Sequence, residues 1–137
     1  MKYLIAVFVF MMPLMAYSAE WKLCVDDKDK KIEVELNSLK VDNKKAVGWI
    51  RTTFRSVQSA GGFRFDQAIE FSAVLCDKKM INNLEGALYL KGDPVYMTKA
   101  DDKLDNYRRV YPDSSGDLKL FILCAEASLN NLKKVAK

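Results

Sequence analysis

The chain has 137 residues, the length of one ordinary domain, and its 22 basic and 18 acidic side chains leave a net charge of +4. Both signs are scattered along the sequence, so this mild basic excess gives no reason to expect a nucleic-acid partner. The chain contains no histidine. This excludes the commonest general base and metal ligand, and with them the Ser-His and Cys-His nucleophile arrangements.

Residues 1–19 have the pattern of a secretory signal peptide. The basic residue Lys2 precedes an apolar block, and small residues follow, so that cleavage after Ser18 or Ala19 fits. The apolar block is short for a membrane span of about 20 residues, which disfavours a permanent anchor. We therefore expect a single exported domain, residues 20–137, in the periplasm or on the outer cell surface, without stable membrane insertion.

The first predicted strand shows a clear alternation. Ile32, Val34 and Leu36 alternate with Glu33 and Glu35, which is the period of two expected of a half-buried strand. The glutamates are expected on its solvent-facing side.

Further strands follow at short intervals. Residues 46–54 are rich in β-branched and aromatic side chains, and residues 59–63, with two glycines, predict a flexible loop. The clearest alternation covers residues 67–76, and residues 83–90 repeat it. A turn at residues 91–94 leads to one more short strand. Because short polar turns join these segments, we expect an antiparallel meander of about five to six strands.

The spacing of the apolar residues changes in the last third of the chain. Residues 98–109 are highly charged and predict a surface loop with room for one helical turn. From residue 113 onward the sequence predicts a helix: Asp113, Ser114 and Ser115 are candidate N-caps, and the apolar residues that follow have helical spacing. The apolar stripe of this helix is centred near Leu118 and Leu129. One helix packed on an antiparallel sheet makes the fold class α+β.

The three cysteines allow one disulfide and leave one thiol. Cys124 lies at the flank of the predicted stripe, and Cys76 ends a strand, so we favour a Cys76–Cys124 bridge that ties the helix to the sheet. Spacing alone also allows Cys24 to pair with either of them. As the residue left over, Cys24 is expected to be a free thiol, a buried small hydrophobe, or the bridge of a disulfide-linked homodimer.

Two pairs of carboxylates are the remaining catalytic option. Asp101 with Asp102, or Glu33 with Glu35, could in principle act as acid and base. Acids in charged loops and on exposed strand faces are more often solubilising. Isolated cysteines without histidine also lack the spacing of a zinc site. We therefore expect no enzymatic activity, no metal and no cofactor.

Aromatic residues supply the candidate interaction surface. Trp21 and Trp49 are interpreted as packing residues rather than ligand stackers. Tyrosine and arginine are enriched at protein interfaces and occur together late in the chain. The candidate surface comprises Tyr96, Tyr107, Arg108, Arg109 and Tyr111.

Several short motifs occur together in a fixed order. They are Trp21-Lys22-Leu23 after the signal peptide, VELNSL at residues 34–39, Val47-Gly48-Trp49, Leu75-Cys76 and VYPDSSGDLKLFILC at residues 110–124. In this order and spacing the chain resembles the surface-adhesin protein E-like domains of Gram-negative bacteria. The resemblance implies a small antiparallel sheet, a C-terminal helix tied to it by Cys76–Cys124, and an exported non-enzymatic binding protein. Cys24 departs from the family pattern.

Two functions follow as hypotheses. The first is a surface adhesin, since the named family member is similar to a host-matrix adhesin that recognises vitronectin, laminin and plasminogen. The second is a small periplasmic inhibitor or immunity-type protein that blocks a hydrolase, with residues 99–107 as the inserting loop. Both require a protein partner.

Overall fold

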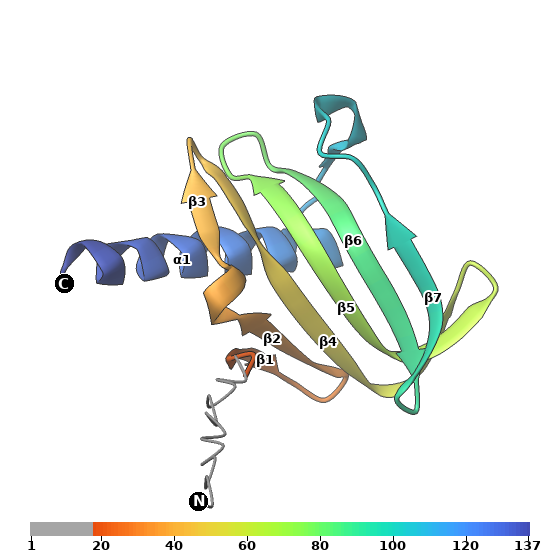
Figure 1. The fold of residues 1–137 in the computed structure, drawn as a ribbon. Coiled ribbons are helices and arrows are strands. Elements are labelled where there is room, and N and C mark those ends of the chain that lie inside the picture. Colours follow the sequence, from red (N-terminus) through yellow and green to blue (C-terminus); the bar gives the residue numbers. More distant parts are fainter. Residues whose placement is uncertain (1–17) are drawn as a thin grey trace, which may run out of the picture.

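The structure, a computed structural model, describes residues 18–137 and shows an antiparallel sheet with one helix across one of its faces (Figure 1). In chain order the elements are β1 (Trp21–Asp26), β2 (Lys30–Glu35), η1 (Leu36–Ser38), β3 (Lys40–Asp42), β4 (Lys45–Ala60), β5 (Phe63–Leu75), β6 (Met80–Leu90), β7 (Asp93–Lys99), η2 (Leu104–Asn106), β8 (Arg108–Arg109) and α1 (Ser115–Val135). Residues 1–17 of the predicted signal peptide lie outside the described residues.

The sheet follows the chain with two small exceptions. Its strand order is β1-β2-β4-β5-β6-β7, while β3 pairs with β4 and β8 pairs with β6, all antiparallel. The predicted α+β fold, an antiparallel meander with a C-terminal helix, is confirmed. The strand count of five to six was too low, because the described residues form eight. The additional strands are β1, β3 and β8, which are too short or too irregular to show a clean alternation.

Tight turns join the long strands. The β4–β5 hairpin turns at Gly61 and Gly62, both with positive φ, and the β6–β7 hairpin turns at Lys91 and Gly92, also with positive φ. Two successive residues of positive φ make the hairpin turn whose twist matches that of the flanking strands. The expectation of a flexible loop at residues 59–63 was therefore wrong, because the strands continue up to the two glycines.

The charged stretch at residues 98–109 is only partly a loop. Its first two residues complete β7, the expected helical turn is present as the 3-10 turn η2, and Arg108 and Arg109 form β8 against β6. In Figure 1 the segment between β7 and β8 projects beyond the ends of the neighbouring strands. The backbone of β8 pairs with Met80 and Ile81, so main-chain hydrogen bonding rather than side-chain pattern determines this segment.

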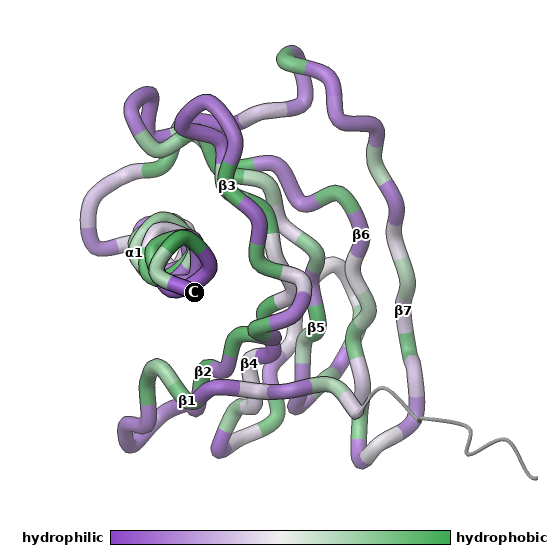
Figure 2. The backbone as a smooth tube through the Cα atoms, turned by 60° about the vertical axis from the view of Figure 1, so that its left-hand side comes forward, coloured by the Kyte–Doolittle hydropathy of each residue, from purple (hydrophilic) through white to green (hydrophobic). Residues whose placement is uncertain are grey.

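The core lies between α1 and the face of the sheet that curves around it, as the view along the helix in Figure 2 shows. Ile32 and Val34 on β2, Ile50 on β4 and Val74 on β5 are all at most 2% exposed and belong to the same cluster as Leu123 of α1. Successive side chains of a strand point to opposite faces of the sheet, and these residues occupy the positions that face the helix. The alternation seen in the sequence therefore identified the buried face of β2 correctly.

The helix begins at the predicted cap, but the side of it that packs on the sheet differs from the predicted side. The side chain of Ser114 accepts a hydrogen bond from the amide of Asp117, which caps the first turn. The buried side is centred on Leu123 and Ala127 rather than on Leu118 and Leu129. Phe121 of the predicted stripe is 68% exposed. The predicted orientation was wrong because the helix carries apolar residues on both sides.

The sheet decides which side of α1 is buried. Gly48 of β4 leaves a depression that the side chains of Leu39 and Leu123 fill; a Cβ atom there would lie 2.8 Å and 3.1 Å from their Cδ2 atoms. On the same side of the helix, Lys119 forms an ion pair with Glu70 of β5. Close packing at a glycine and a charge pair thus fix the rotation of the helix.

The Cys76–Cys124 disulfide is present, with Cα atoms 6.0 Å apart. Cys76 comes directly after β5 and its amide donates to the carbonyl of Lys44. Its parity along the strand matches Ser72 and Val74, which point toward α1. A bridge from the end of β5 to the flank of α1 follows from this geometry.

Candidate binding surface

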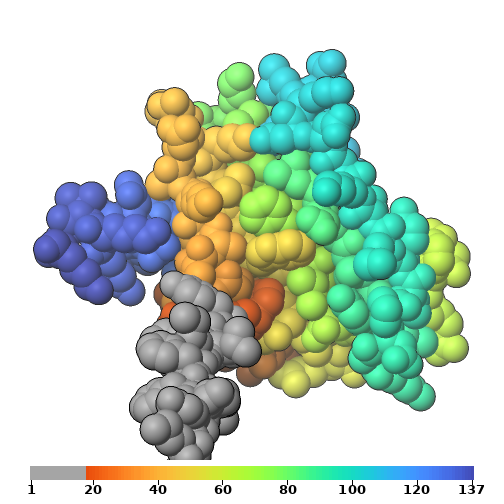
Figure 3. Space-filling view, viewed as in Figure 1, coloured from red at the N-terminus to blue at the C-terminus, as the bar shows by residue number. Residues whose placement is uncertain are grey.

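Within residues 18–137 no α-helix covers the face of the sheet opposite α1, although the segment with Asp101 packs against Asn82 at one end of it; this face is turned to the viewer in Figures 1 and 3. Half-buried side chains from three strands meet there. We call them the aromatic face: Trp21 of β1, Trp49 and Arg51 of β4, and Ile69 and Phe71 of β5. In the strand register Trp49 lies opposite Phe71 and Arg51 opposite Ile69. Alternation along each strand places these residues on the side away from the helix.

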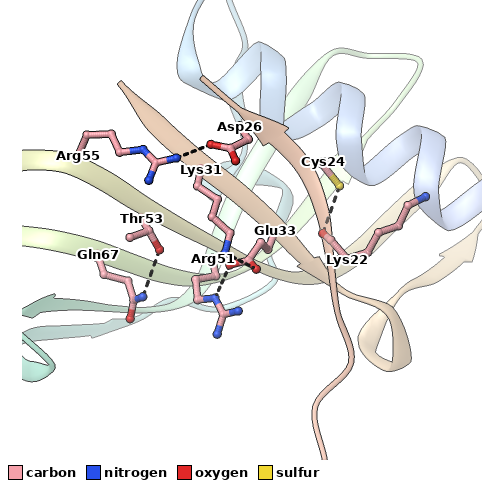
Figure 4. A network of polar contacts seen from close by, with 9 residues as sticks. All are labelled: Lys22, Cys24, Asp26, Lys31, Glu33, Arg51, Thr53, Arg55 and Gln67. Carbon is pink, nitrogen blue, oxygen red and sulfur yellow. Dashed lines mark hydrogen bonds and ion pairs between the residues drawn. The ribbon is translucent and has the colours of Figure 1, made fainter. Parts of the chain in front are cut away.

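Arg51 is the charged centre of the aromatic face. Its Nε atom is 2.8 Å from a carboxylate oxygen of Glu33, and Lys31 binds the other oxygen at 3.0 Å (Figure 4). The guanidinium carbon also lies 4.2 Å from the centre of the Trp21 ring. A guanidinium held by a carboxylate and a tryptophan is pre-organised for stacking and hydrogen bonding.

The rings of Trp21 and Trp49 border a hollow of about 430 Å³. The rings of Trp49 and Phe71 are 5.2 Å apart, tilted by 43°, which is a favourable aromatic contact. The hollow is lined by Ser18, Ala19, Trp21, Glu35, Asn37, Trp49 and Ile69. It is a mostly apolar concavity with a few polar groups, the usual character of a recognition site.

Glu33 and Glu35 are buried, at 7% and 8% exposure, and the expectation that they face solvent was wrong. Burial tends to raise the pKa of the Glu33 carboxyl, but hydrogen bonds from Arg51 and Lys31 outweigh it and the pKa is lowered. Burial likewise opposes ionisation of Glu35, and backbone amide donors again leave its pKa lowered. Depressed pKa values do not suit a general acid at neutral pH.

The other carboxylate pair holds the loop before β8. Asp102 pairs with Lys45 and accepts a 2.6 Å hydrogen bond from the hydroxyl of Tyr107. The hydrogen bond from Lys45 is the largest of the effects that lower the Asp102 pKa. Asp101 pairs with Lys103 at 3.1 Å. The two aspartates therefore bind different partners rather than each other.

The residues of the candidate interaction surface do not form one patch. Tyr107 is only 8% exposed and its hydroxyl is bound to Asp102, so its assignment to a surface was wrong. Burial raises the Tyr107 pKa. Tyr96 lies on β7, where its ring is 4.7 Å from that of Phe63.

Three residues of that candidate surface remain together. Arg108 and Arg109 are exposed on β8, and Tyr111 follows them with 70% of its surface exposed. In the register of β6, Tyr96 faces Leu88 whereas Arg108 faces Ile81. At about 3.3 Å per residue, this separates Tyr96 from the arginines by roughly 20 Å.

Cys24 is not in a disulfide in the structure. It lies in β1 at the register shift between Leu23 and Val25, is partly buried against the core, and its Sγ atom contacts the carbonyl of Lys22 at 3.6 Å (Figure 4). Burial is the largest cause of its raised pKa. A raised pKa makes the reactive thiolate scarcer at neutral pH. A homodimer linked through Cys24 stays a prediction.

The aromatic face was missed because its residues were interpreted singly. Trp49 and Arg51 share a parity in residues 46–54, and Ala46, Gly48 and Ile50 take the opposite parity. This second alternation was present in the sequence. It could have shown that small and aliphatic residues face one layer while large amphipathic residues face another.

Among residues 18–137, no helix combines the length and the apolar character needed to cross a membrane. The same part of the chain holds no group of three or more cysteine, aspartate or glutamate side chains that could bind a metal ion. Comparisons with family models, curated proteins and solved structures find no match to this chain.

Proposed function

We propose that the chain is an exported, non-enzymatic binding protein that recognises a host matrix protein through the aromatic face. The observation that supports this proposal is a sheet face on the side away from α1, where Trp21 and Trp49 border an apolar hollow and Arg51 stacks on the Trp21 ring. Tryptophan and arginine are the residues that most often dominate the binding energy of protein interfaces. Here they are half-buried and held by neighbours, which lowers the entropy that binding would cost.

Export is supported by two features. The predicted signal peptide places the chain outside the cytoplasm, and the Cys76–Cys124 disulfide is compatible with an oxidising compartment. The proposed location is the outer cell surface, with the periplasm as the alternative.

Binding can be tested with residues 20–137 and immobilised vitronectin, laminin and plasminogen at physiological salt. We expect saturable binding to at least one of them, weakened about 30-fold by Trp49→Ala, the loss typical of an interface hot spot. Trp21→Ala, on the edge strand β1, should also weaken binding. Tyr111→Ala is the matched control, since Tyr111 is 70% exposed but lies outside the aromatic face.

Thermal unfolding of each variant separates lost binding from lost folding. No saturable binding to any matrix protein would rule out the adhesin proposal, and equal loss in the Tyr111 variant would exclude the aromatic face as its site. Protease treatment of intact cells tests the location, because complete protection of the chain would favour the periplasm.

The inhibitor hypothesis is supported by a different observation. Leu104, at the projecting η2 turn, is 60% exposed, while the ion pair of Lys45 with Asp102 and the Tyr107 hydroxyl hold the loop behind it. A rigid loop with an apolar tip suits insertion into an enzyme cleft. Inhibition of a lysozyme-like hydrolase that is lost in Leu104→Asp and kept in Trp49→Ala would favour this function over adhesion.

A further inference from the structure

The carboxylate of Glu35 is buried without a charged partner. The residue is 8% exposed, and its Oε1 atom accepts hydrogen bonds of 3.2 Å from the backbone amides of Glu20 and Asn37. None of the ion pairs among residues 18–137 includes it. Glu33, two residues earlier and equally buried, is neutralised by Arg51 and Lys31. Backbone amides thus stabilise the ionised form of Glu35, and its site leaves room for an opposite charge that none of these ion pairs supplies.

One of the two backbone donors, the amide of Glu20, lies at the predicted end of the signal peptide. Glu20 is held on both sides, because its amide donates to Glu35 and its carbonyl accepts a 2.8 Å hydrogen bond from the amide of Leu36. Strand β1 begins at the next residue, Trp21, which pairs with Glu35. The nitrogen atom of residue 20 is thus fixed against a buried carboxylate by the end of the sheet itself.

We propose that an export peptidase hydrolyses the Ala19–Glu20 peptide bond and that the new α-ammonium group of Glu20 forms an ion pair with Glu35. One water molecule is consumed: the acyl carbon of Ala19 gains the oxygen and becomes a carboxylate, and the nitrogen of Glu20 becomes an ammonium group. The inference rests on the predicted export of the chain and is independent of the ligand that the aromatic face binds.

Cleavage replaces a neutral amide donor with a charged one at the same position. A charge-assisted hydrogen bond is roughly twice as strong as a neutral one, and the buried carboxylate gains a counter-ion. Among residues 18–137 no lysine or arginine side chain forms an ion pair with Glu35, and the basic residues Arg51 and Lys31 pair with Glu33 instead. The lysines of the helix C-terminus border a separate hollow beside Glu20: Lys133, Lys134 and Lys137.

Cleavage also changes the aromatic face. Ser18 and Ala19 line the hollow together with Trp21 and Trp49. Removal of these two residues opens that side of the hollow, while the ion pair keeps β1 in register beside it. Processing and exposure of the binding surface would therefore be one event.

The cleavage site is tested by mass spectrometry of the N-terminal peptide of the protein recovered from the cell envelope. The expected first residue is Glu20. A chain that begins at Ala19, or at any other residue, overturns the proposal while leaving export intact. A chain that keeps residues 1–19 overturns both export and this proposal.

The ion pair is tested by NMR titration of the α-amino group in a chain that begins at Glu20. Its pKa should lie about one unit above the ordinary value of roughly 7.7–8.0. Glu35→Gln should return it to that range, whereas the matched variant Glu33→Gln should keep most of the shift. An α-amino pKa that is ordinary in the unsubstituted chain, or equally raised in Glu35→Gln, overturns the ion pair.

Acetylation of the α-amino group gives a test that does not depend on a variant folding. The acetyl group keeps the N–H donor and removes only the charge. We expect the unfolding equilibrium constant at pH 7 to be about tenfold larger for the acetylated chain, the factor equivalent to one pKa unit. Equal stability of the two forms contradicts the proposal.

Discussion

At the scale of single residues, neighbours decide what a glutamate does. Glu33 and Glu35 have the same type, strand face and burial, yet one is bound by two cationic side chains and the other by backbone amides. Both arrangements favour the ionised form and lower the pKa. The sequence shows two alternating acids, and only the fold supplies their different partners.

Because the pKa of Glu33 is lower in the folded chain than its ordinary value of 4.5, this residue stabilises the fold above that pH. The contribution is lost as the pH falls through the folded-state pKa. Urea unfolding between pH 7 and pH 3 should show a steep loss of stability on the acid side. The slope of unfolding free energy against pH gives the number of protons taken up on unfolding, and in Glu33→Gln this number should be smaller by up to one. An unchanged slope would contradict this role.

Gly48→Ala tests the contact that orients the helix. The added Cβ would lie 2.8 Å from Leu39 Cδ2 and 3.1 Å from Leu123 Cδ2. We expect a loss of about 1–3 kcal/mol in the free energy of unfolding, the usual cost of overpacking a core. Gly86→Ala is the matched control, because its Cβ would meet nothing closer than 3.5 Å. Denaturant unfolding measures both, and equal losses would show that the contact at Gly48 is unimportant.

At the scale of the element, α1 has apolar residues on opposite sides and cannot choose its orientation alone. The buried side is centred on Leu123 and Ala127, and Phe121 and Leu132 point outward with about two thirds of their surfaces exposed. Its C-terminal half extends past the edge of the sheet (Figure 1). The disulfide from Cys124 therefore holds the helix where its packing against the sheet is greatest.

Opening the disulfide should release this constraint. The bridge spans 48 residues, a loop for which the chain-entropy model gives about 4 kcal/mol of stabilisation. We expect the double variant Cys76→Ser/Cys124→Ser to lose about 2–4 kcal/mol in denaturant unfolding. Cys24→Ser should change stability much less, since Cys24 forms no bridge in the structure. A comparable loss in the Cys24 variant would point to an alternative pairing.

At the scale of the whole molecule, the sheet separates two environments. One face packs against α1 and forms the core, and the other keeps half-buried aromatic residues around Arg51 in contact with solvent. In Figure 3 the strands on this open face lie side by side with no helix in front of them. An asymmetric two-layer molecule of this kind leaves one broad surface free for a partner.

Local features of this protein follow from the order of its residues alone. Alternation identified the side of β2 that faces the helix, the capping candidates at residues 113–115 placed the start of α1, and the cysteine positions favoured Cys76–Cys124. These signals are local because strand parity, capping and turn chemistry depend on neighbours within a few residues.

Which layer covers which face of the sheet depends on packing between distant segments. The tertiary structure buried Glu33 and Glu35 by placing Arg51 and the start of β1 beside them. It also turned Phe121 and Leu129 of the predicted stripe outward by fitting Leu123 against Gly48. It also moved Tyr107 inside and gathered the aromatic face from three strands. These outcomes depend on contacts between segments far apart in the chain, and the pattern within one segment does not specify which other segment will cover it.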